Sequence, residues 1–166
     1  MRSTDVLIDG FGRVAGNVHA VLDGITPEQL IHRPAADANT IAWLVWHLTR
    51  GQDAQIADVA GTEELWLGSG FYYRFGLPFP PPATGYGQSP DEVAQVVAEP
   101  ELLAEYYDAT HAATISYLQG LSDDDLDRVI DENWNPPVTL GVRLVSILDD
   151  DAQHVGQAAY IRGLFG

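Results

Sequence analysis

Apolar residues recur three to four positions apart in four long stretches of the chain, the spacing that gathers them on one face of an α-helix. Ser3 or Thr4 can cap the first predicted helix. Asn39 or Thr40 can cap the second, which ends at Gly61. The apolar stripes are Leu7, Phe11, Val14, Val18 and Leu22 in the first helix, and Ile41, Leu44, Val45, Leu48, Ile56 and Val59 in the second.

Two further helices are predicted in the second half of the chain. Ser89 and Pro90 form a helix start, after which the chain either kinks or restarts at Pro100. Thr139 caps the last helix. The connector before it contains a short helical turn at Ser122 and a segment around Ile130 that can pair briefly as a strand. The stripes are Leu103, Tyr106, Tyr107, Thr110, Thr114, Tyr117, Leu118 and Leu121, then Leu140, Leu144, Ile147, Leu148, Val155, Ala158 and Ile161.

The segment from Trp66 to Gln88 breaks the helical pattern. It holds five glycines, four prolines and seven aromatic residues, so neither a helix nor an ordinary strand is expected. Because aromatic rings favour burial, we predict an ordered flap over one end of the helices, either as a pocket wall or as a packed surface loop. The whole pattern predicts an all-α fold, an antiparallel four-helix bundle with one long crossover loop, in a single domain over residues 1–166.

The amino-acid composition excludes several classes of site and partner. The chain has no cysteine and no lysine, which excludes a thiolate metal site, a protein-borne thiol nucleophile and a Schiff-base lysine. Its formal charge of −16 argues against nucleic acid and anionic membranes as partners. No apolar run reaches the roughly 18 residues of a membrane span, and no signal-peptide core opens the chain, so a cytoplasmic location is expected.

The last predicted helix carries the strongest candidate chemistry. Asp150 and His154 stand one turn apart, about 40° around the helix axis, where two side chains can grip one metal ion. His47, on the flank of the second helix with Gly51 leaving room beside it, is the best third ligand. Asp151 falls nearer the centre of the apolar stripe, and spacing alone does not choose between Asp150 and Asp151.

Other histidines have weaker claims on a metal. His111 also flanks an apolar stripe and is the reserve candidate, whereas His19 and His32 are less well placed. The competing interpretation is structural. A histidine at the edge of an apolar face is usually half-buried and hydrogen-bonded, and an aspartate one turn before a histidine is a common surface pair.

The set of His47, Asp150, His154 and the following Val155-Gly156-Gln157 resembles the signature of the DinB-like four-helix bundles over nearly the whole chain. That superfamily includes mycothiol-dependent maleylpyruvate isomerase and thiol S-transferases. The stretch from Asn39 to Gly61 also resembles an actinobacterial branch described as a domain of unknown function. Asp150 departs from the pattern, which has Glu there in the isomerase and His in other members. Asp is one methylene shorter than Glu, so either the backbone sits closer to the ion or the metal binds more weakly.

The resemblance implies a divalent metal held by His47, Asp150 and His154, with Zn²⁺ favoured and Ni²⁺, Fe²⁺ or Mn²⁺ as alternatives. An open coordination position would activate a low-molecular-weight thiol such as mycothiol for transfer to, or isomerisation of, a small electrophile. Gln157 and Arg50 are the candidate catalytic side chains. Gln157 would orient a ligand or a bound water, and Arg50 would meet a substrate carboxylate or pair with a metal-ligand Asp. The competing interpretation of Arg50 is an ordinary salt bridge. The alternatives are a metal-dependent hydrolase, or a non-catalytic small-molecule-binding or stress-associated protein. A homodimer through a bundle face is compatible with any of them.

Overall fold

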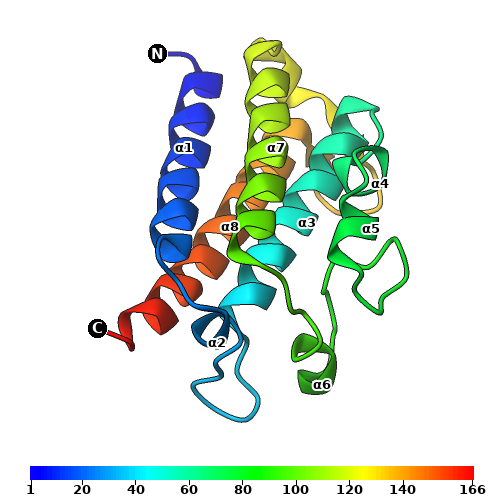
Figure 1. Ribbon diagram of the computed structural model, residues 1–166. Coiled ribbons are helices and arrows are strands. Elements are labelled where there is room, and N and C mark those ends of the chain that lie inside the picture. Colours follow the sequence, from blue (N-terminus) through cyan, green and yellow to red (C-terminus); the bar gives the residue numbers. More distant parts are fainter.

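Four long helices build the protein, whose computed structural model describes residues 1–166 (Figure 1). They are α1 (Ser3–Leu22), α3 (Ile41–Ala60), α7 (Pro100–Gln119) and α8 (Leu140–Gly163). Helices α7 and α8 each pack against both α1 and α3, so α1 faces α3 across the bundle and α7 faces α8. The predicted all-α four-helix bundle is therefore confirmed.

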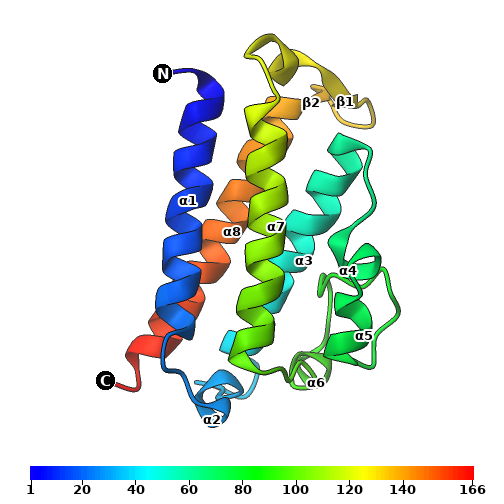
Figure 2. The same ribbon diagram turned by 45° about the horizontal axis from the view of Figure 1, so that its top comes forward.

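The long crossover between α3 and α7 determines the helix directions. Figure 2 shows α1 and α8 running one way and α3 and α7 the other, so the packed pairs α1/α7 and α3/α8 are antiparallel. The pairs α1/α8 and α3/α7 are parallel, because the crossover returns the chain to the end at which α3 begins. One long connection of this kind is a known variant of the four-helix bundle.

The crossover is more helical than its composition predicts. It contains the short helices α4 (Leu65–Gly68), α5 (Phe71–Phe75) and α6 (Pro90–Val93), while α2 (Pro27–Leu30) joins α1 to α3. The expectation of no helix between Trp66 and Gln88 is wrong there. Gly70 and Gly76 flank α5, and both have left-handed backbone conformations, which glycine adopts readily. The short helix therefore fits between two glycines that begin and end it.

Helix starts follow the capping residues that the sequence offers. The Thr40 hydroxyl accepts the Trp43 amide at 3.1 Å, and the Thr139 hydroxyl accepts the Val142 amide at 3.4 Å, which confirms both caps. The first helix instead has Arg2 as its cap, because the Arg2 amide donates to the Asp5 carboxylate. The chain restarts as α7 at Pro100.

A small structured connector closes the end of the bundle before α8. It comprises a 3₁₀ turn (Asp124–Asp127) and the antiparallel strands β1 (Val129–Asp131) and β2 (Val138–Thr139). The short strand expected around Ile130 is therefore present.

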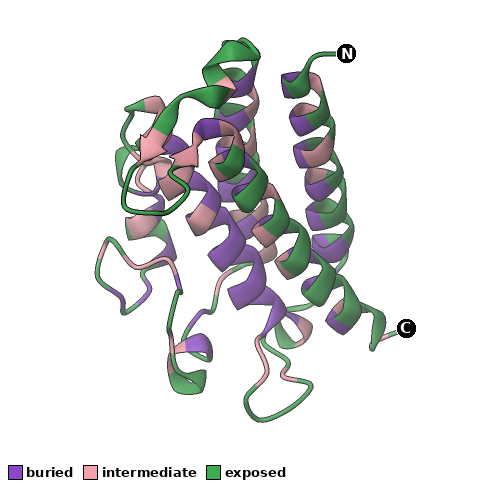
Figure 3. Ribbon diagram, turned by 180° about the vertical axis from the view of Figure 1, so that it is seen from behind, coloured by how far each residue is buried: buried purple, intermediate pink, exposed green.

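The N-terminal half of α3 is enclosed on all sides. Every residue from Ile41 to Arg50 is buried, which appears as the purple stretch of the central helix in Figure 3. The sequence predicts one buried face only. Helices α7 and α8 and the crossover cover the rest, with Trp66, Phe71, Phe75 and Phe79 packed into the main core. None of the helices combines the length and apolarity needed to cross a membrane.

Candidate metal centre

Three potential metal donors converge between α3 and α8. His47 on α3 and Asp150 and His154 on α8 each offer one ligand atom, and these atoms lie within 4.8 Å of one another. The two helices are antiparallel neighbours, so a side chain two turns into α3 meets the middle of α8. The rings of His47 and His154 meet edge to face, with centroids 4.7 Å apart.

The crossover fixes the orientation of His47. Its Nδ1 lies 2.6 Å from the carbonyl oxygen of Thr84. A carbonyl can only accept, so Nδ1 carries the proton and Nε2 keeps a free lone pair. Trp43 stacks on the ring at 4.5 Å, and its own Nε1 donates to Gln88 at 2.8 Å. Two residues of the crossover thus hold the imidazole and the indole beside it.

His154 is oriented by its own helix. Its Nδ1 lies 2.7 Å from the backbone carbonyl of Asp150, which again places the proton on Nδ1 and leaves Nε2 free. Metal-binding histidines commonly donate the second ring N–H to a carbonyl or carboxylate in this way. Both imidazoles are therefore held in the tautomer that binds metal through Nε2.

The structure separates the roles of Asp150 and Asp151. Asp150 has a side chain 45% exposed and belongs to the cluster with the two imidazoles. Asp151 is buried in the bundle interior, and its Oδ2 has no hydrogen-bond partner. Burial, and secondarily the charge of Asp150, holds the pKa of Asp151 well above its usual range. Burial therefore favours the neutral form of Asp151 in the core, and Asp150 is the carboxylate placed beside the two imidazoles.

The electrostatics also favour a neutral His47. Burial lowers its pKa, and although the bond to Thr84 and the charge of Asp150 oppose this change, the net direction is downward. A neutral imidazole is the form that binds metal, because the imidazolium has no lone pair on Nε2.

A surface cavity of about 410 Å³ opens beside the cluster. His47, Gly51 and Asp150 line it, and a Cβ on Gly51 would stand 3.9 Å from Asp150 Oδ2. Thr84 and Tyr86 of the crossover also line it. The flap therefore contributes a pocket wall at this end, while its bulky aromatics pack into the core at the other.

The donor set fits a divalent ion. Two imidazole nitrogens with free lone pairs and one carboxylate are ligands shared by zinc, nickel, iron and manganese sites. Three protein ligands are typical of catalytic zinc, in which a further position stays open to water or substrate. The cavity is lined by two of the three donors, His47 and Asp150.

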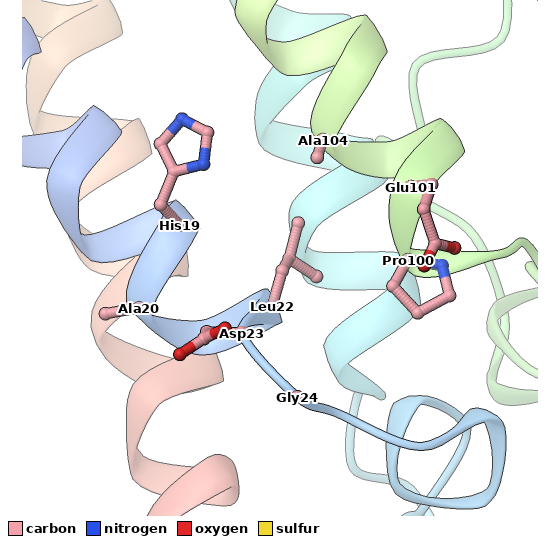
Figure 4. A pocket seen from close by; sticks show the side chains of 8 residues that line it. All are labelled: His19, Ala20, Leu22, Asp23, Gly24, Pro100, Glu101 and Ala104. Carbon is pink, nitrogen blue, oxygen red and sulfur yellow. The ribbon is translucent and has the colours of Figure 1, made fainter.

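The other histidines lie apart from this cluster. His19 pairs with Asp108 at 2.9 Å and lines a separate cavity of about 510 Å³ between α1 and α7 (Figure 4). His111, the reserve ligand, stacks on Tyr107, and His32 meets Phe165 edge to face. None of the three joins the donor group.

The two candidate catalytic side chains make no hydrogen bond to the donors. Arg50 is completely buried, and its guanidinium contacts Glu64 at 2.8 Å and the Ala83 carbonyl at 3.1 Å. Its burial and its ion pair with Glu64 favour a structural role, and a contact with a substrate carboxylate stays a prediction. Gln157 is exposed in a different cavity of about 490 Å³, beside Tyr160, and makes no hydrogen bond to the three donors. Its catalytic role stays a prediction.

Sequence reasoning missed Thr84 and Gly85. A Cβ on Gly85 would stand 2.7 Å from Nδ1 of His47 and close to two tryptophan rings, and the residue has φ +98°. Only glycine lets the backbone approach the imidazole here. The glycine-rich composition of the segment is the one signal that pointed to a close approach.

Comparisons with known proteins agree with this architecture. Residues 11–158 match the family model of the DinB superfamily. The crystal structure of a conserved protein from Enterococcus faecalis is 37% identical in sequence and superposes with a TM-score of 0.91, covering 98% of this chain and 96% of that one. No curated protein matches the chain.

Proposed function

The chain belongs to the DinB superfamily, and from that premise we propose that it is a divalent-metal-dependent enzyme acting with a low-molecular-weight thiol of the mycothiol type. The thiol would be transferred to a small electrophile or used to isomerise one. The observation that carries this proposal is the cluster of His47, Asp150 and His154 beside an open cavity, with both imidazoles anchored through Nδ1.

Different residues of the chain would have different roles in this activity. His47, Asp150 and His154 would hold the ion, with Zn²⁺ favoured, and the bonds of both Nδ1 atoms to the carbonyl oxygens of Thr84 and Asp150 leave each Nε2 with a lone pair to offer. A divalent ion at this position supplies a Lewis acid that lowers the pKa of a coordinated thiol, so that a nucleophile exists at neutral pH. The chain has no cysteine, so the sulfur must come from a small molecule.

Metal content tests the first half of the proposal. We expect about one divalent ion per chain in tag-free protein, measured by mass spectrometry. His154→Ala should lose it, and His111→Ala is the matched control, because that histidine lies outside the cluster. A metal-free protein that also fails to bind added Zn²⁺ or Ni²⁺ would overturn the proposal.

Thiol dependence tests the second half. The metal-loaded protein is mixed with a generic electrophile such as monobromobimane, with and without 2-mercaptoethanol, and the thioether is quantified against protein-free mixtures. We expect acceleration that His154→Ala abolishes. Turnover of an ester without thiol would instead indicate a hydrolase, and metal binding without either reaction would indicate a binding protein.

A further inference from the structure

The cavity beside the donor cluster contains no cationic side chain. Apart from His47 and Asp150, its lining is small or uncharged: Gly51, Ala54, Gln55, Thr84, Tyr86 and Ser146. With no lysine in the chain, only an arginine could add positive charge to this wall.

All eight arginines are engaged elsewhere. Five contact carboxylates, in the pairs Arg2–Asp5, Arg13–Asp9, Arg50–Glu64, Arg74–Glu105 and Arg143–Asp131. The other three, Arg33, Arg128 and Arg162, donate to backbone carbonyls. None of the eight lines the cavity, so a carboxylate on a bound small molecule would find no arginine partner there.

The hydrogen-bonding groups of the wall, apart from His47 and Asp150, are uncharged. Ser146 donates its hydroxyl proton to the Val142 carbonyl at 3.0 Å, and Gln55 donates to the Gly51 carbonyl at 3.2 Å. The serine oxygen and the glutamine carbonyl remain as acceptors, and the second amide N–H of Gln55 and the hydroxyls of Thr84 and Tyr86 remain as donors. An uncharged polar ligand can therefore use both kinds of group, whereas a carboxylate, which cannot donate, can use only the donors.

The net charge of an occupied metal site would also disfavour a second anionic group on the ligand. A divalent ion held by two neutral imidazoles and the Asp150 carboxylate has one net positive charge, which a single thiolate neutralises. A second anionic group on the same ligand would then face Asp150 without compensation, in a chain of formal charge −16.

From these observations we infer that the cavity selects an uncharged polar ligand and discriminates against a ligand with a carboxylate. The inference rests on the proposed thiol function, whose substrate class it specifies. It concerns the part of the thiol distant from sulfur, which lies along Gln55 and Ser146.

A matched pair of thiols tests the inference by binding alone. 4-Mercaptobutan-1-ol and 4-mercaptobutanoate differ only at the end remote from sulfur, so their thiols ionise similarly. Each is titrated into Co²⁺-loaded protein at low ionic strength, and the thiolate-to-cobalt absorption is recorded. We expect the alcohol to bind at least about threefold more tightly.

Two variants of Gln55 test whether the cavity lining causes the preference for the alcohol over the carboxylate. Gln55→Lys adds a cation to the cavity and should shift the ratio of the two dissociation constants toward the carboxylate by at least about threefold. Gln55→Met, uncharged and of similar length, should leave the alcohol preferred. Circular dichroism verifies that both variants keep their helical content.

The binding results distinguish a failure of the ligand-selectivity inference from a failure of the proposed thiol function. Equal or tighter binding of the carboxylate by the unaltered protein, or a Gln55→Lys ratio that does not move, overturns the inference alone. Absence of the absorption with both thiols overturns the proposed thiol function, and the inference with it.

Discussion

His47 and Thr84 are joined by a hydrogen bond of 2.6 Å from the imidazole Nδ1–H to the backbone carbonyl. The bond links α3 to the crossover and decides which ring nitrogen faces Asp150 and His154. The orientation of one metal donor therefore depends on the backbone path of a loop.

Gly85→Ala should disturb this arrangement. The added methyl group would stand 2.7 Å from Nδ1 of His47, at a backbone conformation that alanine avoids, so the loop must move away from the ring. We expect metal affinity to fall about tenfold or more, as for other losses of an outer hydrogen bond. Competition with a chromophoric chelator measures the change.

Gly87→Ala is the matched control for that substitution. Gly87 has φ +75° in the same loop, but nothing lies within 4 Å of the position of its added Cβ. It should cost some stability and leave metal affinity nearly unchanged. Equal losses of affinity in the two variants would mean that backbone strain, and not the contact with His47, is responsible.

Metal removal should lower the stability of the fold. An ion that binds only the folded chain stabilises it by about 2.7 kcal/mol at a free concentration one hundred times its dissociation constant. Thermal unfolding should therefore occur at a higher temperature with Zn²⁺ than with EDTA. His154→Ala should abolish most of this difference, while an unchanged difference would place the ion elsewhere on the chain.

Asp151→Asn should alter the pH dependence of stability. Burial, followed by the charge of Asp150, raises the folded-state pKa above 3.8. The folded chain thus holds a proton that the unfolded chain releases. The contribution of Asp151 to the free energy of unfolding is therefore greatest below pH 3.8. It is lost as pH rises toward the folded-state pKa, by up to about 1.4 kcal/mol per pH unit.

Urea unfolding of the metal-free proteins at several pH values from 4 to 7 checks this sign. The asparagine variant lacks the titrating group, so its stability relative to the unaltered protein should increase with pH across this window. Asp150→Asn is the comparison for metal binding, because it should weaken binding whereas Asp151→Asn should not. A difference in stability that does not change with pH would contradict a neutral, buried Asp151.

Arg50→Met should destabilise the fold without removing a metal donor. It leaves Glu64 and the buried Asp53 without their arginine contacts, and breaking a buried pair typically costs about 3–5 kcal/mol. Glu64 is 35% exposed, which favours the lower end of this range. Arg74→Met, at an exposed pair with Glu105, should cost less than about 1 kcal/mol in the same denaturation assay. Equal losses of unfolding free energy in the two variants would contradict a structural role for Arg50.

The donors themselves could be found from the sequence, because they lie on regular helices. A period of 3.6 residues places Asp150 and His154 on adjoining turns, and the apolar stripe of α8 already puts Asp151 at its centre. Distinguishing the two aspartates required the packing of the bundle around α8, which buries Asp151 and leaves Asp150 beside His47.

The loop contribution could not be predicted in the same way. Thr84 acts through a backbone carbonyl, which every residue has, so no side-chain pattern marks it. Arg50 shows the opposite limitation. Its place one turn after His47 suggested a shared site, but burial among Glu64, Tyr106 and Trp66 gives it a structural role.

The arrangement of donors on α3 and α8 also sets the order of events during synthesis. His47 emerges from the ribosome well before Asp150 and His154, and one imidazole alone is a weak ligand. The complete set exists only after α8 has docked along α3, because the two helices supply the donors jointly. Metal binding at this cluster would therefore follow completion of the bundle, and truncated chains that lack α8 should compete poorly for the cell's metal.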